Sequence, residues 1–415
     1  MAAPERTPLS PYHRRLLMFL SVATFFEGYD FMALTQLLPN VQREFGLSAA
    51  GLGWMSGLIN AGTIFAYLLV RKADVWGRRR VLTLTIAGYT TFTFITGLSS
   101  DVVVFTVAQF FARLFLIAEW ATASVYAAEE FPDDRRATLI GIIQAFSTLG
   151  GVVCAGVVPI ILKTAMGWRT VYFVGVLPLV LVMFARRNLR ETRRFEQLQE
   201  APSEESPRRP GLTAIFRTAY KRRVFLLALV WTLTYMGTQN AVQFWKQFAI
   251  TERGLTDAEV GGSIAIAAVA SMPLVFLAGK LLDMMGRKAA SVLIYAAVAL
   301  GIAGAYGLHG RWPLTVGLSV AIFGVSAVLP VLNNYSAELF PTEYRADAFA
   351  WSNNLLGRAG YVIGPVLVGH LAGDYGWGPA VISTVIFPIL GLIVVLKFFP
   401  ETRGLALEDS SRVPG

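Results

Sequence analysis

Two acidic residues, Glu27 and Asp30, stand three positions apart inside an otherwise apolar stretch near the start of the chain. Residues three apart lie on neighbouring positions of one helix face, so the two carboxyl groups should be close together. In a medium of low dielectric two such groups do not both ionise easily, and they should titrate as a unit. The spacing predicts a proton-carrying site. The alternative is a structural pair that Arg113 or another buried base neutralises.

Arginines inside apolar stretches are the second set of residues suited to chemistry. Arg358 stands near the middle of such a stretch, beside glycines that leave room for a ligand. A guanidinium offers a planar fork that binds a carboxylate through two hydrogen bonds, so Arg358 is a candidate for holding an organic anion. A salt bridge from Arg358 to Asp30 or Glu27 is the alternative, and the two could be successive states of one mechanism.

Arg113 and Glu119 share another apolar stretch. Arg113 is expected to order the contact between the first and fourth helices, and it is also a candidate substrate contact. Glu119 lies six residues further on, near the opposite helix face, so it does not pair with Arg113 within the helix. It is a candidate second proton site, or a buried acid bonded to a neighbouring helix. Lys246, near the end of the seventh stretch, is expected to reach the membrane surface.

Neutral polar and aromatic residues within apolar stretches could complete a binding cavity. Each polar one alone is more often an inter-helix hydrogen bond, and aromatic side chains in so apolar a chain face lipid by default. The remaining candidate substrate contacts are Tyr29, Gln239, Asn240, Gln243, Asn333, Asn334, Asn353 and Tyr361.

These residues must be positioned by helices that cross a membrane. Of the 415 residues, 55% are hydrophobic and 15% are charged, which excludes an ordinary soluble protein and a disordered chain. Because backbone groups in lipid must pair within their own segment, each span-length stretch should be a helix. Twelve stretches lie near 15–38, 51–70, 80–99, 102–128, 137–163, 171–189, 224–249, 259–282, 289–309, 313–337, 346–371 and 377–399.

An internal repeat divides these helices into two sets of six. Residues 128–137 align with residues 337–346, which are 209 positions further on, and six of the ten pairs are identical. The same offset relates Gly28 to Gly237 and Gly151 to Gly360. Parallel repeats of this kind hold a site near the midplane between them. We expect an all-α membrane protein with six-helix bundles over 1–189 and 224–399, a cytoplasmic linker over 190–223 and a cytoplasmic tail over 400–415.

The distribution of charge predicts the orientation. Most of the 36 Lys and Arg residues fall in the terminal segments, the linker and the loops on one side, which should therefore be cytoplasmic, with both termini inside. The net charge of +9 then calls for no nucleic acid. The single Cys154 and the three histidines have no metal-ligand spacing, so we expect no metal and no cofactor besides protons as the coupling ion.

The pattern resembles the major facilitator superfamily over essentially the whole chain. Gly279, Asp283, Gly286, Arg287 and Lys288 match the signature loop of that superfamily, and its counterpart keeps Asp74, Gly77, Arg78 and Arg79 but has Val70 and Val75 where Gly and a basic residue are usual. The resemblance implies charge networks that clasp the halves together when the cytoplasmic side is closed. A simple positive-inside anchor is the alternative. The implied gating residues are Asp74, Arg78, Glu129, Arg136, Asp283, Arg287, Glu338 and Arg345.

Two further motifs are similar to those of the aromatic acid:proton symporter branch. They are Glu27-Gly28-Tyr29-Asp30 and the run from Gly357 to Pro365 that contains Arg358. The first motif, taken with Glu119, is also close to the metabolite:proton symporter branch. Ala112 and Ile117 replace the glycines that are usual around the buried Arg113.

The leading interpretation is a monomeric plasma-membrane importer that moves a small organic anion together with protons by alternating access. A proton-coupled drug or metabolite exporter with Glu119 as coupling acid, a sugar-porter-like transporter and a non-transporting nutrient sensor are the alternatives. No His-Glu-x-x-His, Gly-x-Ser-x-Gly or phosphate-loop motif points to an enzyme.

Overall fold

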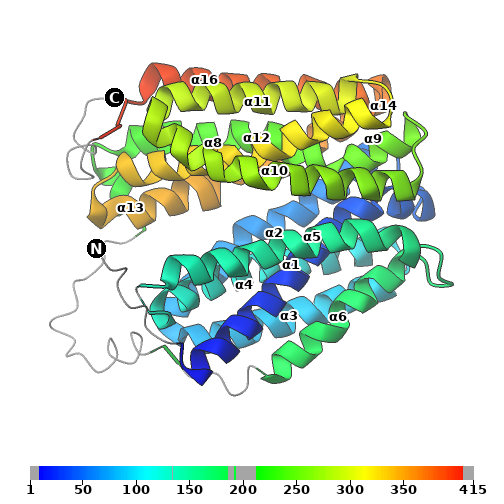
Figure 1. Ribbon diagram of the computed structural model, residues 1–415, viewed down its shortest axis with the longest axis horizontal. Helices are drawn as coiled ribbons and strands as arrows, with labels where there is room; N and C mark the ends of the chain where they lie inside the picture. Colours follow the sequence, from blue (N-terminus) through cyan, green and yellow to red (C-terminus); the bar gives the residue numbers. More distant parts are fainter. Residues whose placement is uncertain (1–8, 133, 186–190, 193–211, 405–415) are drawn as a thin grey trace, which may run out of the picture. The chain divides into compact units, whose positions relative to one another are not determined.

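A computed structural model of the chain describes residues 9–132, 134–185, 191–192 and 212–404, and almost all of these are helical (Figure 1). The first six helices are α1 (Pro11–Glu44), α2 (Ala49–Trp76), α3 (Arg78–Leu98), α4 (Val102–Glu130), α5 (Arg136–Ile161) and α6 (Trp168–Ala185). The later elements are η2 (Ala214–Arg217), α8 (Lys221–Gln243), α9 (Trp245–Thr251), α10 (Asp257–Met285), α11 (Arg287–Gly307), α12 (Arg311–Glu338), α13 (Thr342–Phe349), η3 (Ala350–Gly357), α14 (Ala359–Tyr375), α15 (Trp377–Ser383) and α16 (Ile386–Phe398).

Ten helical segments are long and apolar enough to cross a membrane, by length and composition. α6 and the consecutive pair α8 and α9 complete the twelve spans predicted from the sequence, so the predicted all-α fold is confirmed. Of the predicted linker and tail, residues 190, 193–211 and 405–415 lie outside the described residues.

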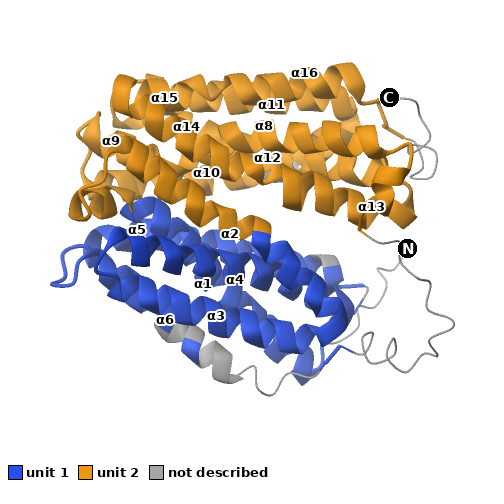
Figure 2. Ribbon diagram, turned by 180° about the vertical axis from the view of Figure 1, so that it is seen from behind, with its two compact units in different colours: residues 1–37, 65–207 blue, residues 38–64, 208–415 orange. Residues whose placement is uncertain are grey.

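The chain forms two compact units, which Figure 2 colours separately. Unit 1 comprises residues 1–37 and 65–207, and unit 2 comprises residues 38–64 and 208–415. The end of α1 and the first part of α2 therefore pack with unit 2, although the sequence repeat places both helices in the first half. The two six-helix bundles that the repeat predicts, over 1–189 and 224–399, stay a prediction.

Glycines bring α1 and α5 of unit 1 into backbone contact. A Cβ atom on Gly28 would lie 1.9 Å from the Ser147 carbonyl oxygen, and one on Gly150 would lie 1.9 Å from that of Phe25. No side chain fits at such distances, so the helices touch at these glycines. Gly28 stands between Glu27 and Asp30, and the contact therefore fixes how α1 presents its two acids.

The core of unit 2 lies around α8, which packs against η3, α14 and α16, while α12 packs against α10 and α11. Large side chains such as Trp231, Tyr295 and Tyr335 are fully buried in this core. Since α8 is central, the polar side chains that it carries are held at a well-packed position within unit 2.

Three stretches that the sequence predicts as continuous helices are interrupted. The seventh breaks at Phe244 between α8 and α9, and the twelfth breaks between α15 and α16. Pro388 explains the second break, because its ring would clash with the carbonyl of Thr384 in a continuous helix. The eleventh stretch contains the π-helix η3, which ends beside Arg358. A Cβ on Gly357 would lie 2.5 Å from the Ser352 oxygen, so the last turn of the π-helix has room only for glycine at this position.

Candidate substrate and proton sites

Arg358 lies where the π-helix η3 passes into α14, a kind of irregularity that is frequent at functional sites. Its Nη1 donates to the Thr63 carbonyl oxygen at 3.2 Å, and its Nε atom is buried without a hydrogen bond among the described residues. Within the same described ranges no carboxylate lies within ion-pair distance of the guanidinium. Arg358 is therefore a half-buried cation, and most N–H groups of its guanidinium make no hydrogen bond to the described residues.

Asn60 ties the first part of α2 to the segment that follows Arg358. Pro365 has no backbone N–H, so the Tyr361 carbonyl lacks the donor that a helix normally supplies four residues further on. The Nδ2 of Asn60 donates to that oxygen at 3.1 Å. The side chain is 2% exposed, so Asn60 satisfies a buried carbonyl that the helix itself cannot satisfy.

Side-chain amides continue the cluster along α8. The Oε1 of Gln243 accepts hydrogen bonds from Gln239 Nε2 at 3.2 Å and from Asn60 Nδ2 at 3.3 Å. The Nε2 of Gln243 is buried and has no hydrogen-bond partner in the described part of the chain. Asn240 is also buried, with its Nδ2 turned to the Met236 carbonyl at 2.6 Å. A donor left over in this way suits a ligand oxygen.

Two tyrosine rings add an aromatic surface to the same cluster. The rings of Tyr235 and Tyr361 lie 4.3 Å apart between centroids. The Tyr235 hydroxyl donates to Asn353 Oδ1 at 2.9 Å, which links α8 to the π-helix. Unit 2 thus gathers a cation, amide groups and aromatic rings, which can hold a carboxylate and the planar group attached to it.

The acids of α1 are buried in unit 1, with Glu27 3% exposed and Asp30 5% exposed. The charge of Arg113 and the Tyr89 side chain both act on the Asp30 carboxyl, and the Tyr89 hydroxyl donates to the Phe26 carbonyl of α1 at 3.4 Å. The Arg113 guanidinium also lies 4.4 Å from the centre of the Phe31 ring. The Phe31 contact places Arg113 of α4 beside α1.

The remaining predicted residues of unit 1 have separate partners. Glu119 is 1% exposed and accepts a hydrogen bond from the Thr85 hydroxyl of α3. The Tyr29 hydroxyl donates to the Val171 carbonyl of α6 at 3.3 Å, so this ring packs inside the unit. Glu119 therefore lies at a contact between α4 and α3, and Tyr29 at a contact between α1 and α6.

A charge network surrounds the turn between α2 and α3. Arg78 Nη2 lies 2.9 Å from Asp74 Oδ1 and 3.2 Å from Glu129 Oε1. Glu191 accepts the Arg78 backbone N–H at 2.9 Å, and Thr192 Oγ1 donates to Glu129 at 2.7 Å. The network thus joins α2, α3 and α4 to a segment that follows α6.

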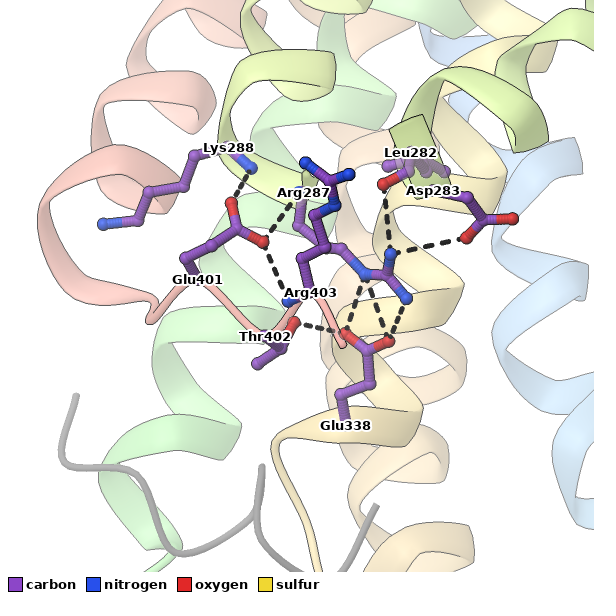
Figure 3. A network of polar contacts seen from close by, with 8 residues as sticks. All are labelled: Leu282, Asp283, Arg287, Lys288, Glu338, Glu401, Thr402 and Arg403. Atoms are coloured by element: carbon purple, nitrogen blue, oxygen red, sulfur yellow. Dashed lines mark hydrogen bonds and ion pairs between the residues drawn. The ribbon is translucent and has the colours of Figure 1, made fainter. Parts of the chain in front are cut away.

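Unit 2 repeats this network around α11, as Figure 3 shows. Arg287 Nη2 lies 2.8 Å from Glu338 Oε1, its Nη1 lies 3.4 Å from Asp283 Oδ1, and the Thr402 hydroxyl donates to Glu338. Glu401 accepts the backbone N–H of Arg287 at 2.8 Å. The duplication is therefore one of side-chain geometry as well as of sequence.

The turns between α2 and α3 and between α10 and α11 each consist of a single glycine. Gly77 and Gly286 have φ values of 92° and 88°, which other residues rarely adopt. The glycine of the Asp-x-x-Gly-Arg motif is therefore a backbone requirement of these turns.

One expectation about a charged residue is wrong. Lys246 is fully buried, because the chain turns at Phe244 and α9 carries the lysine inward. Its Nζ lies 2.6 Å from Asp257 Oδ1 at the start of α10. The ion pair supplies the partner that a buried ammonium needs.

Three predicted residues, Arg345, Asn333 and Asn334, lie outside these clusters in the described part of the chain. Arg345 donates to the Phe340 carbonyl at 3.5 Å instead of joining the Glu338 network. Arg136 is half-buried at the start of α5. Asn333 is exposed and Asn334 half-buried on α12, and in the described residues neither side chain bonds to the Arg358 cluster.

Sequence reasoning missed four polar contributors: Asn60, Thr63, Glu191 and Thr192. A usable signal existed for the last two, because Glu191-Thr192 resembles Glu401-Thr402 and each pair follows the last helix of its repeat. Asn60 and Thr63 carry no such signal, since isolated polar residues in an apolar helix are common. No group of three or more potential metal ligands occurs in the described residues.

Comparison with known proteins agrees with this architecture. The sequence pattern of the Major Facilitator Superfamily matches residues 20–360 and 227–414. The chain is 28% identical over 395 residues to a cis,cis-muconate transport protein of Acinetobacter baylyi, covering 91% of the chain and 92% of the relative. It is 24% identical to a 4-hydroxybenzoate transporter of Pseudomonas aeruginosa, covering 93% and 94%.

A solved structure shares the fold. The crystal structure of a D-xylose–proton symporter superposes with a TM-score of 0.75 at 17% identity, covering 95% of this chain and 99% of that one. Twelve helical spans in the described residues, duplicated charge networks and a pattern match over most of the sequence agree, and the chain belongs to the Major Facilitator Superfamily of multi-pass membrane transporters.

Proposed function

We propose that this transporter imports a small organic carboxylate, aromatic or another planar monocarboxylate, together with protons by alternating access. The observation that carries the proposal is Arg358, a half-buried guanidinium that has no carboxylate partner among the described residues. A charge within a membrane-spanning helix costs free energy unless a partner of opposite charge compensates for it. An anionic substrate would be that partner for Arg358.

The surroundings of Arg358 favour a planar, conjugated substrate. The Tyr235 and Tyr361 rings offer a stacking surface, and the Nε2 of Gln243 offers a donor to an oxygen at a distance from the carboxylate. Two relatives are named for 4-hydroxybenzoate, a conjugated monocarboxylate, and for muconate, a conjugated dicarboxylate. This agreement supports the organic-acid class and leaves the individual compound to experiment.

Proton coupling is assigned to the acids of α1, with Glu119 as a second candidate. Glu27 and Asp30 are buried three residues apart, and Tyr89 and Arg113 act on Asp30. A buried carboxyl that a nearby cation stabilises in its charged form can gain or lose its proton as its surroundings change between two conformations. Such a group links proton movement to transport.

We also propose that the protein is a monomer of the plasma membrane with both termini in the cytoplasm. The excess of Lys and Arg at the termini and in the loops on their side supports this orientation. Reporter domains fused to the C-terminus, one active only in the cytoplasm and one only outside, test it directly.

Binding of candidate acids to the purified protein tests the role of Arg358. We expect benzoate-type or muconate-type acids to raise the melting temperature of the native protein. Replacing Arg358 by Gln should weaken binding by about 10- to 100-fold, and Arg358→Lys should restore only part of it, because an ammonium lacks the planar fork. Arg311→Gln is the control, since Arg311 stacks on Trp312 away from the cluster. Unchanged affinity in Arg358→Gln would refute the proposal.

Uptake into proteoliposomes tests the coupling. We expect an inward proton gradient to drive accumulation of the acid, and Asp30→Asn to permit exchange but abolish gradient-driven accumulation. Uptake that ignores the gradient would exclude symport. Efflux driven by an inward gradient would favour the exporter, in which case Glu119→Gln should be the more damaging substitution.

A further inference from the structure

Two cations from different helices converge on one aromatic ring at the end of unit 2 where α8 begins and α16 ends. The Arg222 guanidinium lies 5.8 Å from the centre of the Phe398 ring, and Lys397 Nζ lies 5.4 Å from the same centre. Lys288 reaches the same turn of α16 and donates to the Leu396 carbonyl at 3.0 Å. Figure 3 shows the Lys288 side chain extending away from the Arg287 network. Three positive charges therefore gather around residues 396–398.

No acid in the described residues pairs with Arg222 or Lys397. Glu401, the acid of the neighbouring tail, accepts the backbone N–H groups of Arg287 and Lys288 at 2.8 and 2.9 Å. Its carboxylate is thus used to cap α11. Like charges held close together repel one another, so the cluster attracts an anion.

Apolar stripes run from this cationic end along both helices. On α8, Phe225 and Leu229 are 56% and 45% exposed, and they share a face with Arg222 by helical spacing. On α16, Ile389 and Ile393 are 40% and 50% exposed. Because α8 and α16 pack side by side, their stripes form one surface with charge at one end and hydrocarbon below it.

We propose that this surface, formed by Arg222, Lys288, Lys397, Phe398 and the exposed apolar side chains beneath them, is a binding site for an anionic phospholipid. The phosphate would lie between Arg222 and Lys397, which stack on Phe398 and keep N–H groups for its oxygens. The acyl chains would follow the stripes on α8 and α16. Clusters of basic residues at the membrane boundary recognise such headgroups electrostatically. The site is independent of the transport function proposed above.

Native mass spectrometry of the detergent-purified full chain tests this site. We expect phosphatidylglycerol to bind the native protein at least several-fold more tightly than phosphatidylethanolamine. The double substitution Arg222→Gln with Lys397→Gln should abolish that preference. Lys72→Gln is the matched control, because Lys72 also stacks on a ring, that of Trp76 at 5.5 Å. A native protein without preference, or a double variant that keeps it, would overturn the proposal.

Two further measurements keep the outcome decisive. A photoreactive phosphatidylglycerol added to the native protein should label residues 222–229 and 386–398, and labelling confined to other helices would contradict the site even if the double variant failed to fold. Competition by soluble glycerol phosphate distinguishes the source of the phosphate. We expect no displacement at concentrations far above those of the lipid, and full displacement would mean a free-phosphate site instead.

Discussion

At the scale of single residues, Asn60 shows how one amide can compensate for a proline in another helix. Pro365 leaves the Tyr361 carbonyl without its helical partner, and Asn60 supplies a hydrogen bond at 3.1 Å. We predict that Asn60→Leu lowers the free energy of unfolding by about 1–3 kcal/mol, because a buried carbonyl then stays unsatisfied. Thermal or denaturant unfolding of the detergent-purified protein measures the change.

The control for this prediction removes the proline as well. In Asn60→Leu combined with Pro365→Ala the backbone N–H returns and can satisfy Tyr361 within α14. The double variant should recover part of the lost stability. If both variants are equally destabilised, the Asn60 amide has some other role than to satisfy that carbonyl.

At the scale of elements, the beginning of α11 depends on an acid that follows α16. Partial burial alone would raise the pKa of the Glu401 carboxyl, but hydrogen bonds from the backbone N–H groups of Lys288, Arg287, Arg403 and Thr402 hold that pKa below its ordinary value. The ionised carboxylate also complements the positive end of the α11 dipole. The ionised form is therefore the one that the folded state prefers.

The consequence is a pH dependence of stability. A depressed folded-state pKa contributes stability above the ordinary value of a glutamate, near pH 4.3, and that contribution is lost as the pH falls through the folded pKa. We predict that Glu401→Gln lowers the melting temperature at pH 7 and reduces the fall of the melting temperature as the pH drops from 5 to 3. Glu343→Gln, at an exposed position of α13, should leave the native profile unchanged. A Glu401→Gln profile parallel to the native one would refute this.

At the scale of the whole molecule, two kinds of feature can be predicted from the sequence. They are the helices, which follow from long apolar stretches, and the candidate site residues, which are ionisable side chains inside such stretches. Asp30 and Arg358 are identifiable because an ionisable side chain in an apolar segment is rare. Asn60 is not, since its role exists only through Pro365 in a distant helix. The prediction that Lys246 reaches the membrane surface failed for a related reason. The burial of Lys246 follows from the helix break at Phe244, and no residue in that stretch predicts a break.

Unit 2 contains a glycine seam between the first part of α2 and α14. A Cβ on Gly53 would lie 2.6 Å from the Pro365 oxygen, and one on Gly57 would lie 2.7 Å from the Val362 oxygen. A Cβ on Gly369 would lie 2.7 Å from Gly53 Cα. The repeat assigns α2 to one half of the sequence and α14 to the other, so the seam joins the two halves at residues 49–64. Alternating access requires such a seam to open and close.

We therefore predict that Gly369→Val, whose branched side chain cannot fit against α2, shifts the protein toward a conformation in which the seam is open. Ser56, fully buried on α2, provides the readout once replaced by Cys in a chain whose own Cys154 is buried. Maleimide labelling of Ser56→Cys should be several-fold faster with Gly369→Val. Gly373→Val, one turn further along α14 with nothing within 4 Å, carries the same intrinsic helix cost and should not accelerate labelling. Equal labelling in both variants would mean that the contact is passive packing and that its glycines do not control opening.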